Sequence, residues 1–171
     1  MIKLDDFIRD VPDFPKEGIL FKDITPLLAS PKAFKACIDQ LAAHAGALGA
    51  EAIVGMESRG FIFGAALAAA VGVPFVPARK PGKLPAKTVS VEYELEYGTD
   101  TLEMHADALK KGTRTLIVDD LIATGGTAEA TAKLIEEVGG VVAGHLFVIE
   151  LEFLAGRKRL GDVPVRALLK Y

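Results

Sequence analysis

The chain has 171 residues and a net charge of −3, which fits one compact domain with a single main hydrophobic core. Half of the residues are hydrophobic and a quarter are charged, a balance that excludes intrinsic disorder. The slightly acidic charge gives no sign of a nucleic-acid partner, and the single cysteine, Cys37, excludes an internal disulfide. Charged side chains among the first ten residues exclude a secretion signal, so we expect a cytoplasmic protein.

One stretch, residues 60–78, carries no charge and by its length alone could span a bilayer. Glycines interrupt it, and Pro74 and Pro77 would stop a helix well short of its end. The pattern instead predicts a buried helix at about 60–71 that is followed directly by a buried strand at 73–76. We therefore expect no association with a membrane.

Strands and helices alternate along most of the chain. Ser30 and Pro31 are typical of an N-cap and a first helical position, and they predict a helix that continues through Leu41. The further elements expected are strands at 52–55, 113–118, 141–149 and 163–168, and a helix at 126–138. This β-α-β order with short loops predicts an α/β fold with a mostly parallel sheet flanked by helices.

One region, residues 80–105, breaks this order. Apolar and polar residues alternate on both sides of a turn near Gly98, which predicts an antiparallel hairpin at roughly 88–105. The segment before it, 80–87, is basic and contains proline and glycine, so we expect a mobile loop. A mobile loop that leads into a hairpin beside a parallel sheet is typical of a flexible lid.

The most informative segment is 116–127, in which a buried strand runs into two adjacent acids and a loop with two glycines opens a helix. Backbone N–H groups would converge at that helix N-terminus, where the helix dipole also favours an anion. The segment predicts a phosphate site, although it is not a Walker loop because it lacks Gly-Lys-Ser/Thr. The expected phosphate ligands are Ala123, Thr124, Gly125, Gly126 and Thr127.

Asp119 and Asp120 lie at the expected carboxyl end of this strand, where open α/β sheets bind ligands. Two carboxylates would repel a phosphate a few ångströms away. They make sense if they face either a metal ion or the neutral hydroxyls of a sugar that carries the phosphate. The alternative is a solvated strand end followed by a capped helix, since short motifs of this kind also arise by chance.

The segment VDDLIATGGT (118–127) resembles the phosphoribosyl-diphosphate (PRPP) motif of the type I phosphoribosyltransferases. Four further segments narrow the resemblance to the adenine phosphoribosyltransferases, namely VPDFPKEGILFKDITP (11–26), ESRGFIFG (57–64), RKPGKLP (79–85) and EYELEYG (92–98). The resemblance covers about residues 7–150. It implies the type I phosphoribosyltransferase fold in one domain, 1–171, with an N-terminal hood at 1–30 that recognises the base and the flexible hairpin inserted at 80–105.

The implied reaction is adenine + PRPP → AMP + diphosphate, a purine-salvage step with Mg²⁺ as cofactor. The resemblance places the 5′-phosphate on loop 123–127 and the ribose 2′- and 3′-hydroxyls on Asp119 and Asp120. Carboxylates there would stabilise the oxocarbenium-like ribosyl centre that forms as the C1′–diphosphate bond breaks. The Mg²⁺ ion is expected to be held mainly by PRPP and water. The basic residues assigned to the diphosphate are Arg59, Arg79, Lys80 and Lys83.

Arg59 stands out because it is a lone charge between apolar segments. It needs a partner, which a bound phosphate would supply. In the family it follows a strained loop with a cis peptide, here between Glu57 and Ser58. The lysines of segment 80–87, taken alone, are equally typical of a solvated surface.

Base recognition is expected from the N-terminal segment. By resemblance, Phe21 and Leu121 sandwich adenine, and main-chain groups around Leu20 and Lys22 read its edge. Such contacts distinguish a 6-amino from a 6-oxo purine by pairing polarity. Without the resemblance, Phe21 would be interpreted as simple core packing.

Glu96 and Tyr97 lie at the expected hairpin tip, where an exposed pair is ordinarily no more than turn polarity. In the family the glutamate is a candidate acid or base for N7 of adenine, and the tyrosine closes over the reaction centre. Closure would exclude water, which could otherwise capture the ribosyl centre. Together with Arg59 they form the expected catalytic set.

Two other functions compete with this one. A xanthine or hypoxanthine phosphoribosyltransferase would need different edge contacts around Phe21, where the match favours adenine. A non-catalytic sensor of PRPP or a nucleotide would need an effector module, and it would be expected to lose Glu96 and the basic residues. The resemblance also implies a homodimer formed near residues 59–78 and the diphosphate-binding loop. Cys37 is expected as a core residue and His145 as a surface or packing residue, and neither is expected to be part of a site.

Overall fold

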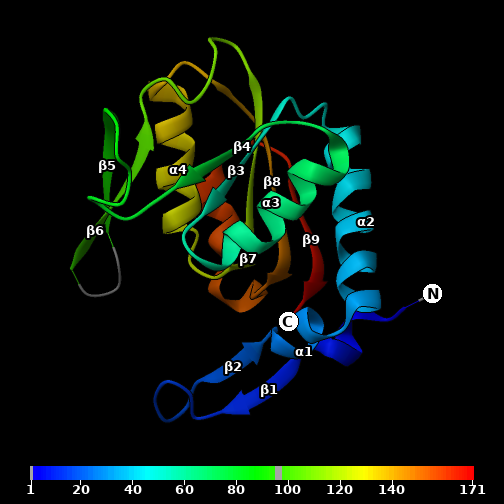
Figure 1. Ribbon diagram of the computed structural model, residues 1–171. Coiled ribbons are helices and arrows are strands. Elements are labelled where there is room, and N and C mark those ends of the chain that lie inside the picture. Colours follow the sequence, from blue (N-terminus) through cyan, green and yellow to red (C-terminus); the bar gives the residue numbers. More distant parts are fainter. Residues whose placement is uncertain (1, 95–97) are drawn as a thin grey trace.

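The computed structural model describes residues 2–94 and 98–171, and at its centre lies a parallel sheet of five strands (Figure 1). Across the sheet the strands are β4 (Phe75–Ala78), β3 (Ala52–Met56), β7 (Arg114–Ile122), β8 (Val141–Glu150) and β9 (Val165–Lys170). The chain builds outward from β3 to β4 on one side, then from β7 to β9 on the other. Open α/β sheets bind ligands at the carboxyl ends of the strands where the order reverses, which here is between β3 and β7.

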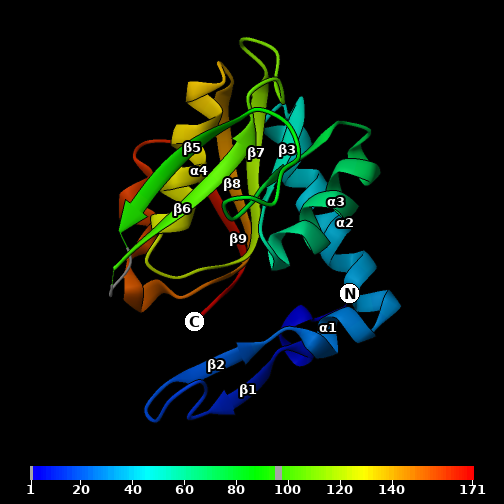
Figure 2. The same cartoon turned by 60° about the vertical axis from the view of Figure 1, so that its left-hand side comes forward.

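Helices cover both faces of this sheet, and the predicted α/β fold is confirmed. Helices α2 (Pro31–Ala47) and α3 (Arg59–Val71) pack on one face and α4 (Gly126–Glu137) packs on the other (Figures 1 and 2). The hydroxyl of Ser30 accepts a hydrogen bond from the Ala33 N–H at 3.3 Å, so the predicted N-cap is present. Successive residues of β3 alternate between two hydrophobic clusters, Ile53 toward α2 and α3 and Val54 toward α4.

The predicted hairpin is also present, as the antiparallel strands β5 (Thr88–Glu94) and β6 (Thr99–His105). Its inner side chains Tyr93, Leu102 and Met104 are buried in the cluster that α4 covers. The hairpin lies beside α4 on the sheet face where a crossover helix would otherwise pack (Figure 2). The body of the expected lid is therefore part of the core, while its tip, with Glu96 and Tyr97, lies outside the described residues.

The N-terminal segment folds into short elements that the sequence did not predict individually. A 3₁₀ turn, η1 (Leu4–Phe7), precedes a second antiparallel hairpin, β1 (Arg9–Pro12) and β2 (Leu20–Asp23), and then the one-turn helix α1 (Thr25–Ala29). The β1–β2 hairpin projects beyond the end of the central sheet in both views (Figures 1 and 2). Two further 3₁₀ turns, η2 (Glu152–Leu154) and η3 (Gly156–Leu160), join β8 to β9.

Three strands have a boundary that differs from the prediction by two residues or more. The strand expected at 73–76 begins at Phe75, because Gly72 ends α3 in the left-handed region and the Val73 N–H still bonds to the helix carbonyl of Ala68. The strand expected at 163–168 runs from Val165 to Lys170, its register set by pairing with β8. The strand expected to end at 118 continues to Ile122.

No helix among the described residues is both long enough and apolar enough to cross a membrane. The uncharged stretch 60–78 is divided between α3 and β4, as its glycines and prolines predicted.

Candidate active site

The carboxyl ends of β3 and β7 bring two chain segments into contact where the strand order reverses. Arg59 begins α3 just after β3, and Asp119 and Asp120 lie near the end of β7. Gly60 makes this approach possible, since a Cβ there would lie 2.8 Å from the carbonyl oxygen of Val118 and 2.9 Å from Oδ1 of Asp119. A side chain at this position would force α3 away from β7.

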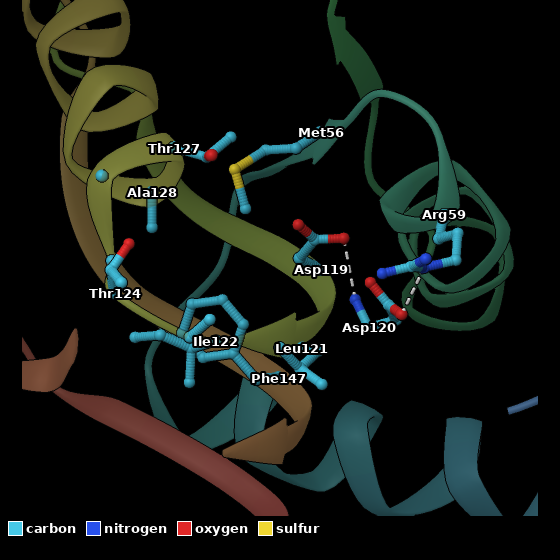
Figure 3. A pocket seen from close by; sticks show the side chains of 13 residues that line it. Met56, Arg59, Asp119, Asp120, Leu121, Ile122, Thr124, Thr127, Ala128 and Phe147 are labelled. Carbon is cyan, nitrogen blue, oxygen red and sulfur yellow. Dashed lines mark hydrogen bonds and ion pairs between the residues drawn. The ribbon is translucent and has the colours of Figure 1, made fainter. Parts of the chain in front are cut away.

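A cavity of about 210 Å³ opens at this point, between the start of α3 and the start of α4 (Figure 3). It brings together Arg59, both aspartates, Leu121 and the whole expected phosphate loop, residues 123–127. Four further lining residues were not anticipated from the sequence, namely Met56, Ile122, Ala128 and Phe147. Phe147 is opposite Asp119 in the register of β8 with β7, so a strand alignment was the signal that could have found it.

An ion pair crosses the cavity. Nε of Arg59 donates to Oδ2 of Asp120 at 2.6 Å, and the Asp120 side chain is only 5% exposed (Figure 3). The partner that the lone charge of Arg59 required is therefore a carboxylate in this conformation. Oδ1 of Asp119 accepts a hydrogen bond from the backbone N–H of Asp120 at 2.9 Å, which orients the Asp119 carboxyl group.

The carboxyl group of Asp119 titrates differently from that of free aspartate. Burial and the negative charge of Asp120 raise the pKa of Asp119 well above its usual range. The pair thus resists carrying two full negative charges side by side. A site with one retained negative charge repels a phosphorylated sugar less than two ionised carboxylates would.

The phosphate loop leads directly into α4. Gly125 occupies the N-cap position in the left-handed region, with φ of 85°, and no side chain in residues 2–94 and 98–171 caps this helix end with a hydrogen bond. The first backbone N–H groups of α4 therefore face the cavity with the positive end of the helix dipole behind them. Such an end favours an anion.

A glycine from the C-terminal part of the chain supports this loop from outside. A Cβ on Gly156 would overlap the carbonyl oxygen of Ala123 and lie 2.9 Å from the Gly125 nitrogen. Gly156, at the start of η3, packs directly against the loop backbone. Sequence reasoning missed this residue because nothing local to it marks a contact with a segment some thirty positions earlier.

A second cavity of about 230 Å³ adjoins the first and shares three of its residues. Its lining is Glu57, Ser58, Arg59, Asp119 and Asp120. Glu57 accepts from the Lys80 N–H at 3.0 Å and from Nε of Arg79 at 3.2 Å. These hydrogen bonds, that from Lys80 most strongly, lower the pKa of Glu57, so it stays ionised. The peptide bond between Glu57 and Ser58 is cis, as the resemblance implies.

Three of the expected diphosphate residues do not line either cavity in the described part of the chain. Arg79 is held at the rim by Glu57. The Lys80 ammonium pairs with Asp100, and the Lys83 carbonyl accepts from Nη1 of Arg79 at 3.2 Å. The basic segment is thus tied to the rim by its own hydrogen bonds.

Two of the expected adenine residues, Phe21 and Leu121, lie near Arg59. Leu121 lines the first cavity, and the ring centre of Phe21 is 5.7 Å from Cζ of Arg59. Neither hydrophobic cluster of the described chain includes Phe21, so the core-packing interpretation has no support. Leu20 is half exposed, and the side chain of Lys22 is nearly buried.

No group of three or more His, Cys, Asp or Glu side chains within 2–94 and 98–171 is arranged to hold a metal ion. Carboxylate oxygens of the aspartate pair are of the type that Mg²⁺ prefers, but Asp120 is already engaged by Arg59. The available carboxylate oxygens therefore fit a cation that takes most of its ligands from a bound substrate and from water rather than from the protein.

Comparison with known proteins gives a family match over most of the chain. The family model described as "Phosphoribosyl transferase domain" matches residues 23–162. The chain belongs to the phosphoribosyltransferase family. Among these phosphoribosyltransferases, the adenine phosphoribosyltransferase of Natranaerobius thermophilus is 54% identical over the whole length of both chains. That of Kosmotoga olearia is 56% identical over 99% of this chain and all of its own.

Solved structures of phosphoribosyltransferases agree with this assignment. The adenine phosphoribosyltransferase of Thermoanaerobacter pseudethanolicus is 54% identical, has a TM-score of 0.95 and covers 99% of this chain and all of its own. The enzyme of Saccharomyces cerevisiae, solved with an imino-altritol bisphosphate and adenine, is 45% identical with a TM-score of 0.93 over 97% and 96% of the two chains. The resemblance to the adenine phosphoribosyltransferases and to their fold is confirmed.

Proposed function

We propose that this chain transfers the 5-phosphoribosyl group from PRPP to adenine and releases AMP and diphosphate, as a step of purine salvage. One observation carries the proposal, the meeting of an uncapped helix N-terminus and an aspartate pair in a single cavity. An anion site beside hydroxyl acceptors is complementary to a phosphorylated ribose. The full-length identity to adenine phosphoribosyltransferases supports adenine as the acceptor.

In this proposal the phosphate and the ribose occupy adjacent parts of the first cavity. The backbone N–H groups and hydroxyls of loop 123–127 bind the 5′-phosphate, while Asp119 and Asp120 accept hydrogen bonds from the ribose 2′- and 3′-hydroxyls. As the C1′–diphosphate bond breaks, positive charge develops on the ribosyl centre, and the charge of the aspartate pair stabilises it. A ring nitrogen of adenine forms the new bond to C1′, diphosphate leaves with the bonding electrons, and the proton on the five-membered ring of adenine is lost to a base.

The diphosphate is assigned to the second cavity and to the basic residues around it. Arg59 lines that cavity, and Arg79, Lys80 and Lys83 lie on the segment that Glu57 holds at the rim. Rearrangement of their present hydrogen bonds would turn these cations toward a bound ligand. Mg²⁺, bound mainly by diphosphate oxygens and water, supplies charge neutralisation for the leaving group.

Base recognition and closure complete the assignment. Phe21 and Leu121 are proposed to hold the two faces of adenine, while main-chain groups around Leu20 and Lys22 read its edge. Glu96 is proposed to act as acid or base at N7, and Tyr97 to cover the reaction centre. A Glu96→Gln variant should then lower turnover more than substrate affinity, and unchanged steady-state turnover would remove Glu96 from the mechanism.

The experiment that tests the function is a nucleotide-formation assay with PRPP and Mg²⁺, in which adenine, hypoxanthine, guanine and xanthine are offered separately. AMP from adenine, with negligible product from the three 6-oxopurines, is the expected result. Product from a 6-oxopurine would favour the xanthine or hypoxanthine alternative and overturn the assignment of the N-terminal segment. PRPP binding without product from any base would favour the sensor.

The proposal also covers the domain organisation, the oligomeric state and the location of the protein. We assign the chain to one domain with a hood at 1–30 and a lid at 80–105, and to a homodimer formed near residues 59–78, where Ile62 on α3 is exposed. Size-exclusion chromatography with light scattering tests the dimer, since a monomer mass would exclude it. A cytoplasmic location follows from the polyanionic substrate, which does not cross a bilayer unaided, and cell fractionation tests it.

A further inference from the structure

The β1–β2 hairpin has no hydrophobic core of its own. None of its strand residues, 9–12 and 20–23, belongs to either hydrophobic cluster of the described chain. An isolated two-stranded hairpin is at best marginally stable in water. The hairpin is connected at its base to Ile8 and Ile24, which pack in the core, and beyond that base its position relative to the cavity depends on a small number of side-chain contacts to the body of the protein.

Consecutive residues of β2 face opposite ways, as in any strand. Phe21 packs edge-on against Phe14, with ring centres 5.1 Å apart, and lies near Arg59 at the cavity. Lys22 extends toward the body of the protein, where its Nζ lies 3.7 Å from the centre of the Tyr171 ring. Only 9% of the Lys22 side chain is exposed.

Tyr171 is itself fixed to the central sheet. Its backbone N–H donates to the Glu150 carbonyl at 3.0 Å, and its carbonyl accepts from the Glu152 N–H at 2.8 Å. Its hydroxyl contacts the carboxylate of Asp5 in η1, and its ring packs against the cluster beneath α2 and α3. The end of β9 lies beside β2 in both views (Figures 1 and 2). Tyr171 is thus a rigid point to which the hairpin can attach.

The second partner of Lys22 does not provide this attachment. Nζ of Lys22 also pairs with Oδ1 of Asp10 at 2.6 Å, but Asp10 lies opposite it on β1 of the same hairpin. That ion pair holds the two strands together and leaves the hairpin free to move as a unit. The ammonium–ring contact is what joins β2 to the sheet, and the low exposure of the ammonium strengthens it.

We propose that Tyr171 is a positioning residue for base recognition, which holds Lys22 and so fixes β2 with Phe21 facing the cavity. The proposal rests on the assignment of adenine to Phe21 and its neighbours. In this proposal Tyr171 does not contact the substrate and acts through Lys22. Loss of the ring should weaken the binding of the base and leave PRPP binding intact, because the phosphate loop and the aspartate pair lie on other elements.

The test compares Tyr171→Leu, which removes the ring, with Tyr171→Phe, which keeps the ring and loses only the hydroxyl. We expect Tyr171→Leu to raise the KM for adenine roughly two- to thirtyfold, the range of one cation–π contact from an exposed to a desolvated site, with the KM for PRPP unchanged. Tyr171→Phe should keep the wild-type KM for adenine. Lys22→Met, which also loses the ion pair with Asp10, should raise the KM for adenine at least as much as Tyr171→Leu, and the double variant should be no worse than Lys22→Met alone.

Hydrogen exchange provides a readout that does not depend on activity. Backbone amides of β1 and β2 should exchange faster in Tyr171→Leu than in Tyr171→Phe, with β8 unchanged in both. Equal exchange in β2, or equal rises in both KM values, would overturn the proposal. If the wild-type protein forms no AMP, the proposed function fails while the exchange comparison still decides whether Tyr171 fixes the hairpin.

Discussion

Arg59 and Asp120 stand 61 positions apart in the chain and form an ion pair with a 2.6 Å contact between Nε and Oδ2. The pair joins the start of α3 to the end of β7 across the cavity. In the proposed reaction Arg59 binds the diphosphate and Asp120 binds the ribose, so a bound PRPP would contact both members of the pair at once. The unliganded pair holds the two groups in place and satisfies the nearly buried carboxylate.

The first prediction concerns the coupling within this pair. Arg59→Gln should reduce the free energy of unfolding by about 1–3 kcal/mol, because it leaves the Asp120 carboxylate buried without its cation. In an Asp120→Asn background, Arg59→Gln should lower the free energy of unfolding much less. Urea denaturation of the four proteins of this cycle measures the coupling. Additive effects of the two substitutions would show that the ion pair does not contribute to stability.

The second prediction concerns the raised pKa of Asp119. Ionising this group is harder in the folded protein than in the unfolded chain, so its contribution to stability falls as pH rises from the ordinary aspartate range through the folded-state pKa. Asp119→Asn should therefore raise Tm at pH 7.5 by about 2–4 °C, the shift that ~1 kcal/mol produces in a domain of this size. The gain should disappear near pH 3, where both states bind the proton.

The amide oxygen at position 119 can still accept the hydrogen bond from the Asp120 N–H, which limits side effects of this substitution. Asp120→Asn is the matched control, since it breaks the ion pair with Arg59 and should lower Tm at pH 7.5. A fall in Tm for Asp119→Asn at this pH would contradict the prediction. Both variants should lose most AMP formation if the pair binds the ribose.

Hydrophobic periodicity, together with residues typical of helix ends and turns, predicted most of the fold. The Ser30 and Pro31 pair located the start of α2, and the alternation around Gly98 located the β5–β6 hairpin. Strand ends were less predictable, because β7 continues to Ile122 only where β8 is present to pair with it. The β1–β2 hairpin escaped prediction since its strands have four residues each and bury little apolar surface.

The residues of the candidate site also fall into two groups, those that the sequence alone indicated and those that it did not. The strand, acids and glycine loop of 116–127 are contiguous, so the sequence alone indicated the phosphate end of the cavity. Residues that reach the site through tertiary packing, such as Phe147 and Gly156, carried no local signal. The pairing of Arg59 with Asp120 was likewise invisible, since a lone charge indicates that a partner is needed and not which one it is.

The third prediction concerns the glycine behind the phosphate loop. Gly156→Ala would place a Cβ into the Ala123 carbonyl oxygen, so the loop must shift. We expect the KM for PRPP to rise roughly tenfold or more, since ~1.4 kcal/mol of lost phosphate binding corresponds to a factor of ten. The KM for adenine should change little, because Phe21 and Leu121 lie outside this contact.

Gly46→Ala is the control for this substitution. Gly46 lies in the last turns of α2, and a Cβ there would meet nothing within 4 Å. Alanine at that site should be neutral or slightly stabilising, since it favours the helix. Thermal unfolding of both variants separates a shift of the loop from general loss of structure. Unchanged PRPP kinetics in a folded Gly156→Ala protein would show that the loop tolerates displacement.

The fourth prediction concerns His145, a buried histidine on β8 whose ring stacks on Phe147. Its Nδ1 has no hydrogen-bond partner in the described chain, and burial lowers its pKa to about 4 from the ordinary 6.5. Between these values the unfolded chain binds a proton that the folded protein does not, so stability falls as pH decreases from 6.5 toward 4. The loss should reach about 3 kcal/mol below pH 4, the equivalent of a pKa difference of this size.

His145→Leu removes this titration. Urea denaturation from pH 7 to pH 4 should show a shallower loss of stability for the variant than for the wild type, whatever the two stabilities are at pH 7. Because every other ionisable group is common to both proteins, the difference between the two slopes isolates His145. Parallel curves over this range would mean that the histidine binds its proton equally well in the folded and unfolded states.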